Sequence, residues 1–195
     1  LFRSASCQTK ISIRYPLIEL LTGVLFGLVA WQYGWSWITL GGLVLTAFLI
    51  SLTFIDADTQ YLPDSMTLPL IWLGLIFNLD GGFVPLQSAV LGAVAGYGSL
   101  WLLCAVYKLL TGKTGMGNGD FKLIAALGAW LGISALPVLI FVSSLIGLVA
   151  AIVMRVAKGQ HFAFGPALTV SGWIIFTAND SVWRAVNWWL THPVL

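Results

Sequence analysis

Long apolar runs separated by short polar segments extend over most of the chain. A membrane-spanning helix needs about 20 apolar residues. The runs predict seven spans, with the third and fifth short for a full crossing, at residues 16–31, 37–55, 66–79, 86–107, 121–133, 137–154 and 162–178. The breaks between them are rich in glycine and other turn residues. The pattern therefore predicts an all-α, polytopic transmembrane bundle of about seven spans, contained in residues 16–178.

The two ends of the chain differ from this pattern. Residues 179–195 are too short and too rich in tryptophan to cross a membrane, which predicts an interfacial C-terminal segment. Residues 1–15 are polar, begin with Leu1 rather than methionine, and carry no signal-peptide pattern. We therefore expect the natural N-terminus to lie upstream of Leu1.

Composition agrees with a membrane protein. Hydrophobic residues make up 59% of the chain, charged residues 8%, and the mean hydropathy is +0.95. Soluble domains carry about 25% charged residues. A net charge of +2 without a basic run argues against nucleic acid as a partner. Two cysteines, Cys7 and Cys104, cannot build a disulfide framework.

Lysine and arginine positions predict the orientation, because cytoplasmic loops carry an excess of these residues. With a cytoplasmic N-terminus, eight of the nine basic residues fall on the cytoplasmic side: Arg3, Lys10, Arg14, Lys108, Lys113, Lys122, Arg155 and Lys158. Only Arg184 falls outside. The same alternation places FIDADTQYLPD (residues 54–64) and GMGNGD (residues 115–120) together at the cytoplasmic face.

Seven acidic residues are available for chemistry. Asp80 and Asp180 fall in outside loops, where they are expected to be solvated. Glu19 lies about one turn inside the first span, and a structural pairing with Arg14 or Arg155 is favoured over a catalytic role. The remaining candidates lie at the cytoplasmic face: Asp56, Asp58, Asp64 and Asp120.

Two of these candidates have unusual settings. Gly117 and Gly119 flank Asp120 on its N-terminal side and let an extended substrate strand approach closely; the simpler alternative is that Asp120 caps a helix beginning at Phe121. Asp56 ends an apolar run, where an acid opposes the helix dipole. We interpret Asp64 as the N-cap of a helix starting at Ser65 and Asp58 as a loop residue. Lys122 is expected to extend to the membrane interface, with a smaller contribution to the charge of Asp120.

Two carboxylates at one membrane face favour aspartic proteolysis. Like charge keeps both from ionising near neutrality, so one polarises the scissile carbonyl while the other activates water. The alternatives are a transporter or channel with intramembrane acids and a purely structural subunit. Transport acids usually lie near the midplane, and a structural subunit leaves the glycine–aspartate motif unexplained.

Four segments of the sequence resemble one family in the same order along the chain. GNGDFKLIAALGAWLG (residues 117–132) resembles the GxGD segment of the prepilin leader peptidases of type IV pilus and type II secretion systems. FIDADTQYLPD resembles their first aspartate motif. ISIRYPLIELLTG (residues 11–23) resembles the first span after their cytoplasmic domain, and FAFGPALTVSGW (residues 162–173) resembles their FGP-containing span.

The resemblance implies specific roles and a location. Asp56 and Asp120 are then the catalytic pair, Gly117 and Gly119 line the substrate approach, and residues 1–15 are the remnant of a cytoplasmic domain. The implied reaction removes the short basic leader of prepilins or pseudopilins at the cytoplasmic face of the bacterial inner membrane, without a metal or another cofactor.

The family also suggests a second activity. Many members N-methylate the new N-terminus with S-adenosylmethionine, and their cytoplasmic domain often carries two CxxC pairs with metal-ligand spacing. Ser4 stands where the first cysteine of the second pair is expected, leaving Cys7 alone. The sequence therefore predicts no metal site, and a need for S-adenosylmethionine only if the longer protein retains methyl transfer.

Overall fold

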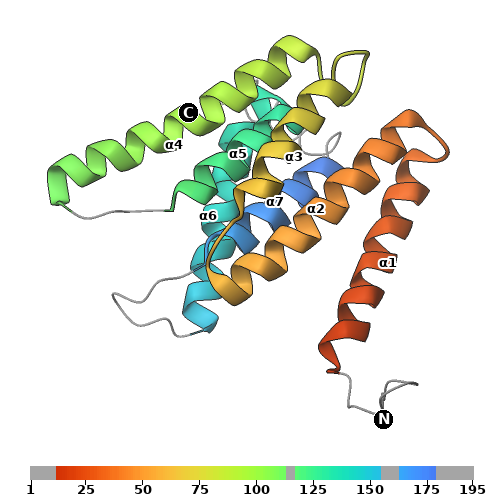
Figure 1. Cartoon of the computed structure of the whole chain (residues 1–195), viewed down its shortest axis with the longest axis horizontal. Helices are drawn as coiled ribbons and strands as arrows, with labels where there is room; N and C mark the ends of the chain where they lie inside the picture. The colour runs from red at the N-terminus through yellow and green to blue at the C-terminus, as the bar shows by residue number, and fades with distance from the viewer. Residues whose placement is uncertain (1–11, 113–116, 155–162, 179–195) are drawn as a thin grey trace, which may run out of the picture. The chain divides into compact units, whose positions relative to one another are not determined.

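The described part of the chain is entirely helical. The computed structural model describes residues 12–112, 117–154 and 163–178, which form seven α-helices and one 3₁₀ turn (Figure 1). In chain order these are α1 (Arg14–Tyr33), α2 (Trp37–Thr59), α3 (Asp64–Phe77), α4 (Leu86–Thr111), α5 (Asn118–Leu131), η1 (Ile133–Ala135), α6 (Leu136–Val153) and α7 (Gly165–Thr177). The all-α prediction is confirmed, and each predicted apolar run holds one helix. The expected interfacial segment at 179–195 lies outside the described residues.

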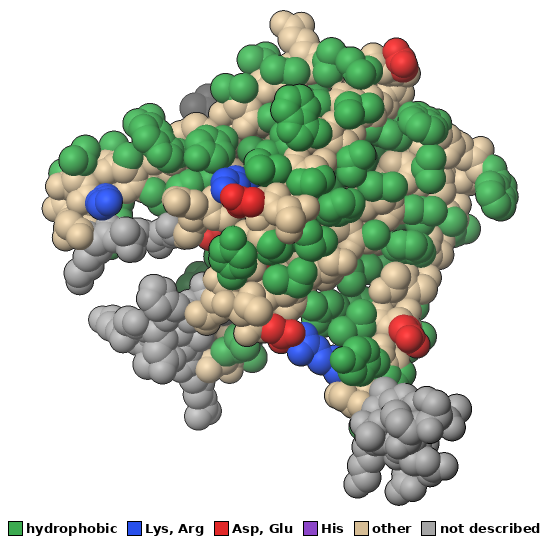
Figure 2. Space-filling model, in the orientation of Figure 1, with side chains coloured by type: hydrophobic (Ala, Val, Ile, Leu, Met, Phe, Trp, Pro, Cys, Tyr) green, Lys and Arg blue, Asp and Glu red, His purple; other side chains and the backbone are tan. Residues whose placement is uncertain are grey.

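The helices differ in their ability to cross a membrane. Four helical segments are long and apolar enough to span it: Arg14–Tyr33, Trp37–Thr59, Leu86–Thr111 and Ile133–Val153. The helices α3 and α7 are apolar but shorter. Large apolar side chains such as Trp72 and Phe141 are exposed, at 64% and 69%, and hydrophobic side chains are spread over the described part of the face shown in Figure 2. Such a surface is typical of a membrane protein, whereas the count of seven spans stays a prediction.

The chain forms two compact units, Leu1–Ala47 and Phe48–Leu195. The first unit contains α1 and the beginning of α2. Gly34, with φ +60°, occupies the left-handed region that ends α1 and begins the turn into α2. The second unit contains the rest of α2 and all later helices, and therefore both aspartate motifs.

Helix α5 forms the core of the second unit. Its side chains from Asp120 to Leu131 are buried, with the exception of the half-buried Lys122. A helix that is apolar on all sides is enclosed by other helices rather than by water, and α3, α4 and α7 all contact it. Enclosure by protein explains why this helix is only 14 residues long, because its length need not match the lipid thickness.

Small residues allow α4 to approach α5 closely. A Cβ atom at Gly92 would collide with the backbone carbonyl of Gly128, and one at Gly96 would lie 3.0 Å from the carbonyl oxygen of Ile124. Glycine at helix contacts lets two backbones pack at short distance. This packing, together with α3 on another side, holds α5 in a fixed position.

Polar side chains fix the C-terminal end of α5 against α3. The indole Nε1 of Trp130 donates to the carbonyl of Leu70 at 2.8 Å, and the buried amide Nδ2 of Asn78 donates to the carbonyl of Ala129 at 2.9 Å. The Asn78 amide oxygen also accepts from the backbone N–H of Val84 at 3.1 Å. These bonds satisfy buried polar groups and anchor the helix whose other end carries Asp120.

Candidate active site

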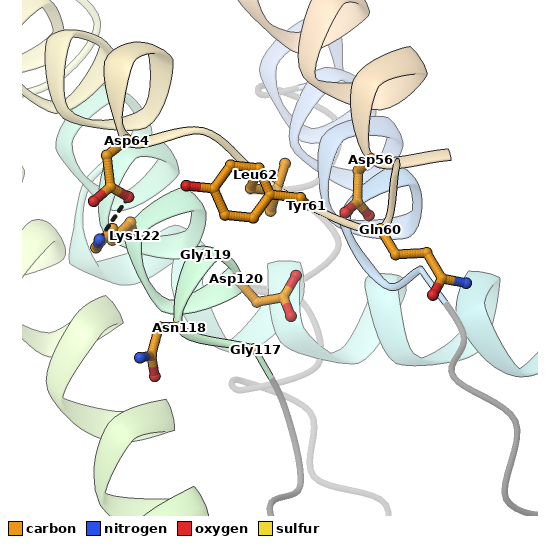
Figure 3. A pocket seen from close by; sticks show the side chains of 10 residues that line it. All are labelled: Asp56, Gln60, Tyr61, Leu62, Asp64, Gly117, Asn118, Gly119, Asp120 and Lys122. Atoms are coloured by element: carbon orange, nitrogen blue, oxygen red, sulfur yellow. Dashed lines mark hydrogen bonds and ion pairs between the residues drawn. The ribbon is translucent and has the colours of Figure 1, made fainter. Parts of the chain in front are cut away.

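Helix ends from four parts of the sequence meet around one cavity. The C-terminal end of α2 meets the N-terminal ends of α3 and α5 at a cavity of about 300 Å³, and the first residue of α7 contacts Asp56 in its wall. Figure 3 shows the side chains that line it: Asp56, Gln60, Tyr61, Leu62, Asp64, Gly117, Asn118, Gly119, Asp120 and Lys122. The fold thus brings both predicted aspartates and both predicted glycines to one place.

Asp56 lies one turn before the end of α2 and is 4% exposed. Its Oδ2 accepts a hydrogen bond of 3.0 Å from the backbone N–H of Gly165, the first residue of α7. The first N–H groups of a helix have no partner within the helix, and they stabilise negative charge. The helix dipole that opposes an acid at the end of α2 is therefore offset by the N-terminus of α7.

Asp120 lies in the first turn of α5 and is 8% exposed. The helix begins at Asn118 with Gly117 as its N-cap, so the alternative in which Asp120 caps a helix starting at Phe121 is wrong. Burial, followed by the negative charge of Asp56, raises the pKa of Asp120 to about 7, against the opposing effect of a hydrogen bond with the Gly117 backbone. Asp120 lies just before the apolar run 121–133. With a pKa of about 7, its carboxyl group is partly protonated near neutral pH.

Gly117 and Gly119 line the cavity for different steric reasons. A Cβ atom at Gly119 would lie 2.8 Å from Cβ of Leu62, which is closer than side-chain carbons approach, whereas one at Gly117 would make an ordinary contact of 3.6 Å with Asp120 Oδ2. Glycine at position 119 therefore lets the segment between α2 and α3 pack against the start of α5. Gly117 is exposed and leaves the cavity wall open.

Lys122 and Asp64 form an ion pair at the edge of the cavity. Nζ of Lys122 lies 2.6 Å from Oδ1 of Asp64, which joins α5 to α3 (Figure 3). Helix α3 begins at Asp64 itself and its N-cap is Pro63, so the expectation that Asp64 is the N-cap is wrong. The sequence contains a signal for this pair, since both residues lie at the start of apolar runs predicted to begin at the same membrane face.

The segment between α2 and α3 supplies cavity residues that the sequence did not indicate. Gln60 adopts φ +54°, and its N–H donates to the carbonyl of Asp56 at 2.8 Å, which ends α2. The next residues are the exposed Tyr61 and the buried Leu62. These three residues lie within FIDADTQYLPD, but only the acids of that motif were expected to take part in the site.

The other acids lie away from the cavity lining. Asp58 is exposed in the last turn of α2, so its expected place in a loop is wrong. Glu19 is exposed on α1 and Asp80 is exposed after α3. Asp180 and Arg155, the second of the proposed partners of Glu19, fall outside the described residues.

Comparison with known proteins settles the family. The model of the type IV leader peptidase family matches residues 43–152, a range that includes Asp56, Asp120 and the ion pair. The chain belongs to the type IV leader peptidase family. Residues 2–33 also match the bacterial peptidase A24 N-terminal domain. The resemblance found in the sequence motifs is thereby confirmed, and the transporter alternative has no support from these matches.

Three relatives of this chain share one name, prepilin leader peptidase/N-methyltransferase. The protein of Neisseria gonorrhoeae is 97% identical over 192 residues, which cover 98% of this chain and 67% of that protein. The protein of Aeromonas salmonicida is 52% identical, over 97% of this chain and 65% of that protein. The protein of Pseudomonas aeruginosa is 47% identical, over 93% of this chain and 64% of that protein. The chain thus spans about two thirds of the length of these relatives. No solved structure matches it.

Proposed function

We propose that this chain is the membrane-embedded catalytic part of an aspartic endopeptidase, with Asp56 and Asp120 as its catalytic pair. One observation carries the proposal: two buried carboxylates from distant helices, α2 and α5, face the same cavity. Burial, and after it the charge of Asp56, raises the pKa of Asp120, as expected for two acids that serve one site.

The substrates are prepilins or pseudopilins, from which the enzyme removes the short basic leader. Family membership and the shared name of the relatives support this substrate class. An extended peptide can approach along Gly117 and Gly119, because glycine leaves its backbone accessible. The cavity of about 300 Å³ holds a few side chains and the attacking water.

The enzyme crosses the bacterial inner membrane several times, with its catalytic cavity at the cytoplasmic face. The proposal includes about seven spans in residues 16–178, a cytoplasmic N-terminus, a remnant of the cytoplasmic domain at 1–15 and an interfacial segment at 179–195. The excess of lysine and arginine on one side supports the orientation. The four helices of spanning length support the membrane location.

Proteolysis in this proposal requires no metal or cofactor, since two carboxyl groups suffice to activate water and protonate the substrate. The relatives are also named for N-methyl transfer, which uses S-adenosylmethionine in the family. Of the ten residues lining the cavity, only Tyr61 and Leu62 are apolar, so the cavity lacks the apolar cleft that an adenine ring requires. We therefore assign methyl transfer to none of the residues that line this cavity.

Leader release is the direct test. Membranes containing the chain are incubated with a prepilin-type peptide, and the released leader is measured by mass spectrometry. We expect release from the unaltered chain and equal release from Asp80→Asn, because Asp80 is exposed and remote from the cavity. A folded chain that releases no leader would contradict the proposal.

A further inference from the structure

The start of α7 contacts the catalytic pair on one side only. The backbone N–H of Gly165 donates to Oδ2 of Asp56 at 3.0 Å, while the carboxyl group of Asp120 lies in the first turn of α5. Gly165 lies outside residues 43–152, the range matched by the family model. The FGP-containing segment marks it in the sequence, but the proposed function gives it no role.

We propose that Gly165 is a positioning residue that keeps Asp56 ionised, so that Asp56 is the base of the reaction and Asp120 is the acid. This inference rests on the proposed function and assigns the proton within the pair. A backbone N–H donor favours the charged form of the carboxylate that accepts from it.

A second polar contact holds the start of α7 against α2. The hydroxyl groups of Thr53 and Thr169 lie 2.6 Å apart, one turn along their helices from Asp56 and Gly165. Thr169 is 1% exposed, and its hydroxyl also lies 3.1 Å from the carbonyl oxygen of Gly165. This partly buried link helps to hold the Gly165 N–H beside the Asp56 carboxylate.

Glycine is required at position 165 for steric reasons. A Cβ atom there would lie 2.5 Å from Oδ2 and 2.9 Å from Cγ of Asp56. Because these atoms belong to the catalytic carboxyl group itself, any larger residue displaces that group. The helix end and the carboxylate are thus in direct van der Waals contact.

The charged surroundings of Asp56 agree with this assignment. Among the described residues lining the cavity, Asp120 faces it from α5, and the remaining charges, Asp64 and Lys122, are paired with each other. Asp58 lies exposed on the same helix. Each acid thus faces the other and lies at a helix N-terminus, that of α7 for Asp56 and that of α5 for Asp120. The direct 3.0 Å bond from Gly165 is the contact by which we place the charge on Asp56 and the shared proton on Asp120.

The reaction then proceeds in two balanced steps. The Asp56 carboxylate takes a proton from water while the water oxygen bonds to the scissile carbonyl carbon, and Asp120 protonates the carbonyl oxygen to give a gem-diol. Asp56 next donates its proton to the leaving nitrogen as the C–N bond breaks, and Asp120 takes a proton from one hydroxyl group. The products are a carboxylic acid and an amine, and both aspartates return to their starting forms.

The test removes the N–H while leaving the shape of the chain unchanged. Replacement of Gly165 by glycolic acid converts its amide into an ester, and kcat/KM for leader release is measured against pH. We expect a bell-shaped profile for the unaltered chain. In the ester, the acid limb should move upward by about one pH unit, because one hydrogen bond to a charged group is lost, while the alkaline limb moves less.

Three other results would overturn the inference. An alkaline limb that moves while the acid limb stays would place the proton on Asp56, and a uniform loss of kcat at every pH would reduce Gly165 to a structural role. If the unaltered chain cleaves the peptide but the pH profile of the ester chain does not move, this inference is wrong and the proposed function stands. An inactive unaltered chain defeats the proposed function.

Side-chain variants test the same contact independently. Gly165→Ala should lower kcat at least ~10-fold, since it displaces the Asp56 carboxyl group; Gly98→Ala, where an added Cβ meets open space, is the matched control. Thr169→Val should move the acid limb in the same direction as the ester, and Thr169→Ser should restore it. Full activity in Gly165→Ala would contradict the positioning role.

Discussion

Lys122 Nζ and Asp64 Oδ1 lie 2.6 Å apart and join α5 to α3 at the edge of the cavity that Asp56 and Asp120 line. The side chain of Asp64 is 52% exposed and that of Lys122 is 24% exposed. An ion pair this exposed contributes at most about 1 kcal/mol. The pair therefore helps to hold the cavity edge, but it is a small part of the stability of the bundle.

Asp64→Asn should accordingly retain most leader release, within a few-fold of the unaltered chain. The substitution keeps the shape of the side chain and removes only the charge of an exposed ion pair. Asp58→Asn should be similarly mild, because Asp58 is exposed outside the cavity lining. Initial rates of leader release check both variants. If Asp64→Asn abolished cleavage in a folded protein while Asp56→Asn did not, the assignment of Asp56 would be wrong.

Alanine at the two cavity glycines should have unequal effects. Gly119→Ala should lower the free energy of unfolding by ~1–3 kcal/mol, because the new Cβ lies 2.8 Å from Cβ of Leu62. It should also lower the rate of leader release. Gly117→Ala should be tolerated in stability, since its Cβ makes an ordinary 3.6 Å contact. Thermal unfolding in detergent measures the difference. Leu62→Gly removes the opposing Cβ, so it should destabilise the Gly119→Ala chain less than it destabilises the Gly117→Ala chain. The reverse order of effects would contradict this packing.

Activity should fall as the pH rises through about 7. The pKa of Asp120 is raised to about 7, so higher pH removes the proton that the acid must supply. The stability of the protein follows the same sign: the folded state binds this proton more tightly than the unfolded chain, so stability decreases as the pH rises from about 4 to 7. Melting temperatures across this window measure the effect, and Asp120→Asn should flatten it. If the melting temperature rose with pH over this window, and Asp120→Asn removed that rise, the raised pKa of Asp120 would be contradicted.

Topology reporters test the membrane arrangement. Gly112 follows the C-terminal end of α4, and Gly82 lies in the turn that precedes this helix. This apolar helix of 26 residues is long enough to cross a membrane. Reporters fused at Gly112 and Gly82 should therefore report opposite sides, with Gly112 cytoplasmic. Both reporters on the same side would contradict the arrangement.

Much of the architecture could be predicted from the apolar runs alone. Each run became a helix, because backbone groups in an apolar environment must bond within their own segment. Whether a run faces lipid or protein could not be predicted, since both surroundings favour the same residues. This is why α5 could be identified as a helix, while its complete enclosure by α3, α4 and α7 emerged only from the structure.

The candidate site was predicted in its acids but not in its contacts. Asp56 and Asp120 stand out because acids are costly beside apolar runs. The hydrogen bond from Gly165 to Asp56 connects residues that are distant in sequence, so local pattern carries little information about it. For the Lys122–Asp64 pair the pattern indicates only a shared membrane face, not the contact itself. The capping roles expected for Asp64 and Asp120 failed because each helix begins one to three residues earlier than the apolar pattern suggests.

The most direct measurement is a double-mutant cycle on the two aspartates. Leader release is measured for Asp56→Asn, Asp120→Asn and the double variant, each checked for folding, with Asp80→Asn as the control. Because two acids that share one water act as a unit, each single change should remove nearly all turnover, and the double change should add little. Substantial cleavage by either folded single variant, or losses that multiply in the double variant, would contradict a shared catalytic pair.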